Sequence, residues 1–134
     1  MKIILYHGTD SLFDVIDLSK SKERRDFGVG FYTTTISSQA ENWARSKTKR
    51  NHTGSAYVYV YEANIDEHLF VCEHLDMSLE WLEMIRQNRE MGGIQHKYDI
   101  VIGPVANDDT MLTVSRYIAG VYTAKEAIER LKIF

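Results

Sequence analysis

Two short stretches near the N-terminus contain residue types that could bind or transform a polar ligand. The first is YHGT at residues 6–9, which places an imidazole, a glycine and a hydroxyl directly after the apolar run at 3–5. An imidazole both donates and accepts hydrogen bonds, so a site that holds a polar ligand at the end of a sheet is one interpretation. The other is an ordinary turn after a strand. The stretch alone leaves both open.

The second stretch is DFGVGFYTT at residues 26–34. Gly28 and Gly30 flank a valine, so the backbone there can approach another group closely or adopt a positive φ. Tyr32 follows and could present a flat ring to a flat ligand. The alternative is a strand that begins with a glycine bulge, and the stretch alone favours neither interpretation.

Two basic clusters, at residues 20–25 and 45–50, could bind phosphate groups. Charge runs of this size usually solvate a surface, and we expect that role for most of these side chains. Arg25 is the exception, because it precedes the two glycines, where a ligand phosphate would lie if the second stretch forms a pocket.

Other chemistries have little support in the sequence. The five histidines show no spacing typical of metal ligands, and the single cysteine, Cys72, excludes an internal disulfide and a cysteine-based zinc site. We therefore expect no metal. The common hydrolase, metalloprotease, P-loop and dinucleotide-binding motifs are also missing from the sequence.

Length and composition predict one domain over residues 1–134. The chain is 44% hydrophobic and 26% charged, which is ordinary for a globular protein. Its net charge of −3 gives no general attraction to nucleic acid or to an acidic membrane. No run approaches the ~18 apolar residues of a spanning helix, and we expect no membrane association and a reducing, cytoplasmic setting.

The elements that must position these residues mix strands and helices. Strands are predicted at 2–6, 31–35, 56–65, 68–74 and 98–105. Helices are predicted at 37–50, 76–91, 107–120 and 123–134. Strand 56–65 alternates, with valines 58 and 60 on one face and tyrosines 57, 59 and 61 on the other. Because strands and helices do not alternate strictly, we expect an α+β fold.

Three helix starts have recognisable caps. Ser37 or Ser38 could cap the first helix, and Asp76 the second. Thr123 and Glu126 have the spacing of a capping box at the start of the last helix.

Taken in order, YHGT, DFGVGFYTTT and SSQAENWA resemble the NAD-binding core of ADP-ribosyltransferases, especially the poly(ADP-ribose) polymerase type. With EWLEMIRQNRE and YDIVIGPVANDD included, residues 1–132 are similar to a bacterial family catalogued as domain of unknown function 3990. The resemblance implies an ADP-ribosyltransferase-like split β-sheet core flanked by helices.

The resemblance implies roles for individual residues. His7 would hydrogen-bond a ribose hydroxyl of NAD, and the Gly8 backbone would pair with the nicotinamide carboxamide. Thr9 would support that turn. Tyr32 would line the nicotinamide pocket, and with His7 it makes up the expected catalytic pair.

Five further residues complete the expected NAD-binding set: Arg25, Gly28, Gly30, Ser38 and Trp43. Ser38 is the nearest match to the carboxamide-binding serine of the polymerases. Trp43 matches a second aromatic of the pattern, or it is a core residue of an amphipathic helix.

The implied chemistry is loss of nicotinamide from the ribose, which leaves an oxocarbenium-like carbon for a nucleophile to attack. Transferases of this kind supply a Glu or Gln from a late strand. No such strand follows 98–105, so this third residue and the last strand are expected beyond Phe134. Glu126 and Glu129 are expected to be surface and capping residues. We expect weak NAD binding or slow transfer, and an uncovered sheet edge that favours self-association.

Three functions follow from these expectations. The first is NAD-dependent ADP-ribosyl transfer to an unknown macromolecular acceptor, in the form of a toxin encoded beside a small antitoxin protein. The second is a non-catalytic domain that binds NAD or ADP-ribose. The third is an interaction module using the tyrosine face, ranked last because such a stripe usually packs within a sheet.

Overall fold

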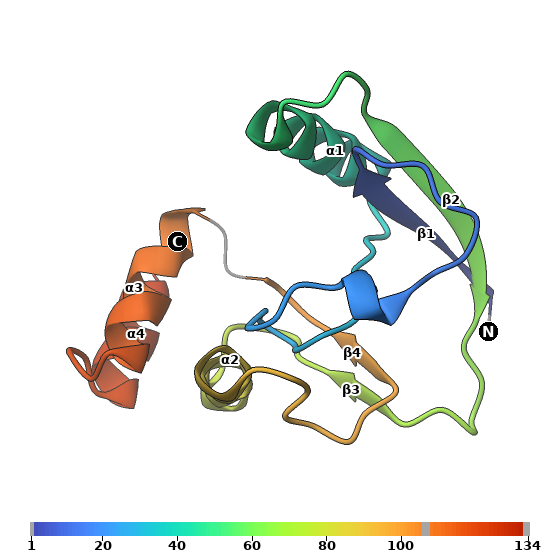
Figure 1. The fold of residues 1–134 in the computed structure, drawn as a ribbon. Coiled ribbons are helices and arrows are strands. Elements are labelled where there is room, and N and C mark those ends of the chain that lie inside the picture. The colour runs from blue at the N-terminus through green and yellow to red at the C-terminus, as the bar shows by residue number, and fades with distance from the viewer. Residues whose placement is uncertain (1, 106–107, 133–134) are drawn as a thin grey trace. The chain divides into compact units, whose positions relative to one another are not determined.

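The computed structural model describes residues 2–105 and 108–132. Over these residues it contains four α-helices and two small two-stranded sheets, so the expected α+β class is confirmed (Figure 1). The chain divides into two compact units. The first unit comprises residues up to 19 together with 31–68, and the second comprises 20–30 together with residues from 69 onward.

The first unit is a two-stranded antiparallel sheet covered on one face by a helix (Figure 1). Strand β1 (Lys2–Thr9) pairs antiparallel with β2 (Tyr57–Asn64). Helix α1 (Ser37–Asn51) buries its two alanines, Ala40 and Ala44. The alternation predicted for β2 is confirmed. Strand β1 runs through Thr9, so YHGT lies within the strand and not after it as predicted.

The strand expected at residues 31–35 does not form. Only one bridge joins this segment to β1, with Tyr6 N–H donating to Thr34 O at 2.8 Å and Thr34 N–H donating to Tyr6 O at 2.9 Å. The Tyr32 carbonyl, which an extended ladder would place opposite Gly8, accepts a hydrogen bond from the His7 ring. A strand needs repeated backbone pairing, and this segment has a single bridge to β1.

Two of the predicted helix caps are wrong by a few residues. Helix α1 has Ile36 at its N-cap with no side-chain cap, so both candidate serines lie in the first turn. Helix α2 (Leu79–Met91) is capped by Ser78, whose hydroxyl accepts from the Trp81 N–H at 3.2 Å, and not by Asp76.

The second unit contains the larger apolar core. Helices α2, α3 (Asp108–Ile118) and α4 (Ala124–Leu131) contribute its buried residues, which are Trp81, Leu82, Ile85, Val114, Ala127 and Leu131. Two short parallel strands, β3 (Val71–Glu73) and β4 (Ile100–Ile102), complete the unit.

Two smaller features remain. A 3-10 turn, Leu18–Lys20, ends at the first residue of the basic cluster at 20–25. The capping box predicted at Thr123 is confirmed, with Thr123 Oγ1 accepting from the Glu126 N–H at 3.2 Å. In the described part of the chain, none of the helices combines the length and the apolar character required to cross a membrane.

Candidate functional site

The outer edge of β1 exposes an unusual pair of backbone groups at Gly8. Both backbone groups of Tyr6 bond to Thr34, so they point away from β2. Backbone N–H and C=O groups alternate in direction along a strand. The N–H and C=O of His7 therefore point toward β2, and those of Gly8 point away from β2, as those of Tyr6 do. No described residue gives Gly8 a hydrogen bond on that side. Gly8 is buried, and buried backbone groups rarely lack partners.

The backbone pairing between β1 and residues 31–35 ends beside Gly8. If the pairing of Tyr6 with Thr34 continued, Tyr32 would lie opposite Gly8. The Tyr32 carbonyl instead accepts from Nδ1 of His7 at 2.6 Å. The N–H and C=O of Gly8 therefore lie where a ladder has just stopped, and they form one donor and one acceptor side by side.

The His7 ring has a defined orientation. A carbonyl oxygen can only accept, so Nδ1 is the donor in the contact with Tyr32. The ring stacks on Phe31 with centroids 4.2 Å apart, and it meets the Phe13 ring edge-on at 5.9 Å. These three contacts hold the imidazole in place.

His7 belongs to an aromatic cluster that also contains Phe13, Phe31, Tyr59 and Tyr61. The Tyr59 hydroxyl donates to the Phe13 carbonyl at 2.9 Å and accepts from the Phe13 N–H at 2.7 Å. Burial and the neighbouring Tyr59 raise the pKa of Tyr61. The packing interpretation of this tyrosine face is therefore confirmed for Tyr59 and Tyr61.

Gly8 also has a packing role on the face of β1 covered by α1. A Cβ atom at this position would lie 2.1 Å from the Ala40 carbonyl oxygen and 3.0 Å from the Ala44 nitrogen. No side chain fits between the strand and the helix. The same residue thus allows close packing on one side and presents its backbone at the strand edge on another.

The end of β1 is anchored by side-chain hydrogen bonds. Thr9, which is buried, accepts from the Ser11 N–H through Oγ1 at 3.2 Å. The Asp10 carboxylate accepts from Asn51 Nδ2 and Thr53 Oγ1, each at 2.9 Å. These two hydrogen bonds lower the pKa of Asp10 and join the end of β1 to the end of α1.

Two of the predicted site residues lie on α1. Ser38 is exposed in the first turn. Trp43 is 43% exposed, so its interpretation as a core residue is wrong. The helix packs through its alanines, and the indole stays accessible at its flank.

The remaining three predicted residues belong to the second unit. Gly28 has φ +87, and a Cβ there would lie 2.8 Å from Asn88 Oδ1. Its N–H donates to the Arg25 carbonyl at 3.1 Å, and the Gly30 N–H donates to Ser21 Oγ at 3.1 Å. The two glycines therefore build a turn of the second unit. Arg25, Gly28 and Gly30 therefore lie in the second unit, and the other predicted residues lie in the first, where His7 and Tyr32 are in contact.

The buried residue that holds this turn, Asn88, was not predicted. Its Nδ2 donates to the Met84 and Asp26 carbonyls at 2.8 and 3.3 Å, and its Oδ1 accepts from the Gln95 N–H at 2.8 Å. Arg89 Nε donates to the Asp26 carboxylate at 2.7 Å. The available signal was a polar residue on the apolar stripe of α2, three positions after Ile85.

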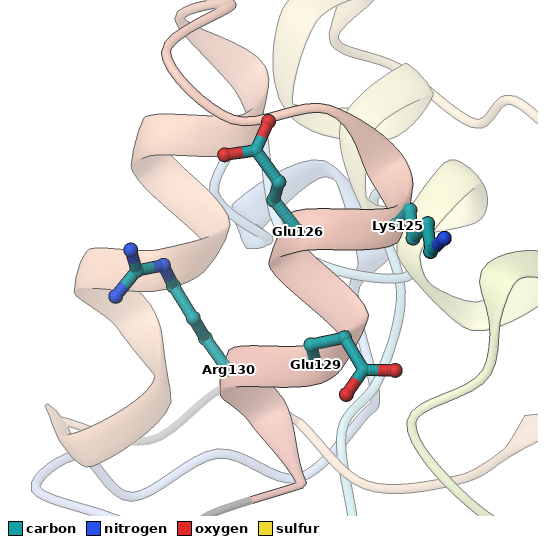
Figure 2. Close-up of a pocket in the computed structure, with 4 residues that line it drawn as sticks. All are labelled: Lys125, Glu126, Glu129 and Arg130. Atoms are coloured by element: carbon teal, nitrogen blue, oxygen red, sulfur yellow. The ribbon is translucent and has the colours of Figure 1, made fainter.

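Two late acids have structural roles, as expected. Glu126 Oε1 accepts from the Thr123 N–H at 3.3 Å within the capping box. Glu129 forms an ion pair with Lys132 at 3.2 Å. Both side chains project from α4, as Figure 2 shows.

Glu126 and Glu129, with Lys125 and Arg130, line a surface depression of about 350 Å³ (Figure 2). Arg130 lies over the Tyr122 ring, 4.4 Å from its centroid. None of the predicted site residues lines this depression. Over residues 2–105 and 108–132, no three His, Cys, Asp or Glu side chains gather as a metal site would require.

Comparison with known proteins gives one match. A family model described as protein of unknown function (DUF3990) matches residues 3–134. Neither a curated protein nor a solved structure gives a significant match. The match spans nearly the whole chain and so includes the sequence of both units.

Proposed function

The chain belongs to the DUF3990 family, and we propose that its first unit binds NAD and supports transfer of the ADP-ribosyl group to an acceptor. The observation that supports the proposal is the unpaired N–H and C=O of the buried Gly8. A primary carboxamide has an acceptor oxygen beside a donor nitrogen, so it complements such a pair as another strand would. Nicotinamide bears this group on a flat ring.

The orientation of the His7 ring supports a place for the NAD ribose beside it. Its Nδ1 donates to the Tyr32 carbonyl at 2.6 Å, and the proposal assigns Nε2 of the same ring to the ribose. In the proposed complex Nε2 accepts from a ribose hydroxyl. The stack on Phe31 keeps the ring from turning, which reduces the entropy lost on binding.

The rest of the proposal extends the resemblance. Tyr32 flanks the nicotinamide ring, Thr9 supports the strand end, and Ser38 and the accessible Trp43 contribute from α1. The ADP-ribosyltransferase-like split-sheet fold belongs to the same proposal, and the two separate small sheets are compatible with it.

The proposed reaction breaks the bond between the ribose anomeric carbon and the nicotinamide nitrogen. The acceptor nucleophile forms the new bond to that carbon and loses a proton, and nicotinamide leaves with the bonding electron pair. Chemistry of this kind uses a Glu or Gln to stabilise the positive ribose, and the proposal assigns that role to no residue described here. In the proposed biological setting the acceptor is a macromolecule, and a small antitoxin protein restrains the activity.

Calorimetric titration with NAD, and separately with nicotinamide, tests the site. We expect wild type to bind both ligands. In His7→Ala we expect the affinity for NAD to fall by about fivefold, since one neutral hydrogen bond contributes ~1 kcal/mol. His68→Ala is the matched control, because His68 is an exposed histidine of the same unit. Equal NAD affinity in wild type and His7→Ala, or no NAD binding by wild type, would reject the proposal.

A non-catalytic NAD or ADP-ribose binder is the second candidate. The observation that favours it is the engagement of Glu126 and Glu129 in structural contacts of α4, which leaves neither as the acid. Radiolabelled NAD separates the two candidates. Nicotinamide release with label transferred to an acceptor supports the transferase, whereas NAD binding without release supports the binder.

A further inference from the structure

The outer edge of β2 is an open hydrogen-bonding edge. The backbone N–H and C=O of His7 point toward β2, so those of its partner Tyr59 point toward β1. Backbone groups alternate in direction along a strand. The N–H and C=O groups of Val58, Val60 and Glu62 therefore point outward, away from β1. No described residue accepts from or donates to these outward groups.

This edge lacks the features that usually protect exposed strands. Strand β2 is eight residues long and contains neither proline nor lysine. Its one charged residue, Glu62, already pairs with Lys2 at 3.3 Å. The Val60 side chain is 62% exposed. An apolar edge of this length favours the addition of another strand.

We propose that β2 pairs antiparallel with β2 of a second copy of the chain, about a two-fold axis at Val60. The outward groups of the two strands then face each other in hydrogen-bonded pairs. Val60 lies opposite Val60 of the partner subunit, and Val58 lies opposite Glu62 of the partner subunit. The result is a four-stranded sheet continuous across the dimer.

The strand is self-complementary in this register. Tyr59 meets Tyr61 of the partner subunit, an aromatic cross-strand pair of the kind that stabilises sheets. An axis at Glu62 would oppose two carboxylates, which is unfavourable, and an axis at Val58 would leave the end of the strand unpaired. Self-complementarity is the reason to assign a second copy to this edge. The proposal goes beyond NAD binding and does not depend on it.

Disulfide trapping tests the register. In a Cys72→Ser background, we expect Val60→Cys to form a disulfide-linked dimer, because residues in a hydrogen-bonded antiparallel pair have Cα atoms ~5.5 Å apart, within disulfide range. Glu62→Cys is the matched control on the same edge and face. It would lie four residues out of register with its own copy, roughly 13–14 Å away, so it should stay monomeric on a non-reducing gel. Equal trapping of both variants, or of neither, would overturn the proposal.

A proline substitution tests the hydrogen bonds. Val60→Pro removes an outward N–H and leaves the ladder to β1 intact, which is the one orientation a strand tolerates. By sedimentation we expect wild type to dimerise and Val60→Pro to dimerise about tenfold or more weakly, because two symmetry-related hydrogen bonds are lost. Val60→Thr keeps the N–H and should dimerise as wild type does.

Circular dichroism checks that the Val60→Pro variant is folded. If this variant is unfolded, the disulfide experiment alone tests the proposed dimer. A monomeric wild type at the highest concentrations used for sedimentation would contradict the proposal. So would unchanged dimerisation of a folded Val60→Pro variant.

Discussion

Gly8 shows how one residue can satisfy two demands at once. Its missing side chain lets α1 approach β1, and its N–H and C=O lie at the strand edge without a protein partner. At the same edge the His7 ring donates to the Tyr32 carbonyl, which an extended ladder would place opposite Gly8. The candidate site therefore combines two adjacent residues, one that contributes a side chain and one whose side chain must be absent.

Gly8→Ala should destabilise the first unit. The added methyl would lie 2.1 Å from the Ala40 oxygen, and backbone cannot move away cheaply. We expect the free energy of unfolding to fall by ~1–3 kcal/mol, the usual cost of overpacking, measured by urea denaturation. Gly54→Ala is the matched control, because no atom lies within 4 Å of the added methyl there. An equal effect of both substitutions would argue against close packing at Gly8.

At the scale of elements, side-chain hydrogen bonds join segments that are distant in the sequence. Asp10 joins the end of β1 to residues at the end of α1. Asn88 of α2 holds the backbone on which Gly28 turns. The capping box begins α4. Each of these links depends on a polar side chain whose partners are specific and geometrically fixed.

The Asp10 contacts predict a pH dependence of stability. Hydrogen bonds from Asn51 and Thr53 lower the pKa of Asp10 in the folded protein, so the folded state binds its proton less readily than the unfolded state. The stabilisation is therefore complete above the unfolded pKa of about 3.9 and is lost as the pH falls through the folded value. Thermal denaturation should show Asp10→Asn less stable than wild type at pH 7, with the difference narrowing as the pH falls below about 3.9. Asp14→Asn, an exposed neighbour, is the control. A difference in stability that stays constant down to the lowest pH at which the protein is folded would contradict this account.

At the scale of the whole molecule, the two units differ in how they are stabilised. The second unit has an apolar core with Trp81 fully buried. The first unit has few buried side chains and relies on a two-stranded antiparallel sheet, an aromatic cluster and small residues under α1. Its indole, Trp43, is accessible.

The two tryptophans should report separately on the two units. Acrylamide should quench the emission of Trp43, which is 43% exposed, far more than that of Trp81, which has no exposed surface. We expect Trp43→Phe to remove the easily quenched, longer-wavelength component, and Trp81→Phe to remove the protected component. Two components of equal accessibility in the folded protein would contradict the assignment.

Local patterns predicted most of the elements. The alternation of β2, the apolar stripe of α2 and the capping box of α4 are properties of neighbouring residues, and all three appear in the structure. The YHGT and DFGVG stretches were recognised as unusual for the same reason. The match of the family model to residues 3–134 confirms the resemblance to the DUF3990 family.

The sequence by itself thus determined the α+β class, the family and the residues that deserve testing. Only the tertiary structure decided that residues 31–35 do not form a strand, that Gly8 keeps an unpaired N–H and C=O, and that Val60 faces outward. The physical reason is that a helix satisfies its hydrogen bonds within its own segment, whereas a strand satisfies them with a distant one. Which backbone groups remain open therefore depends on how distant segments meet.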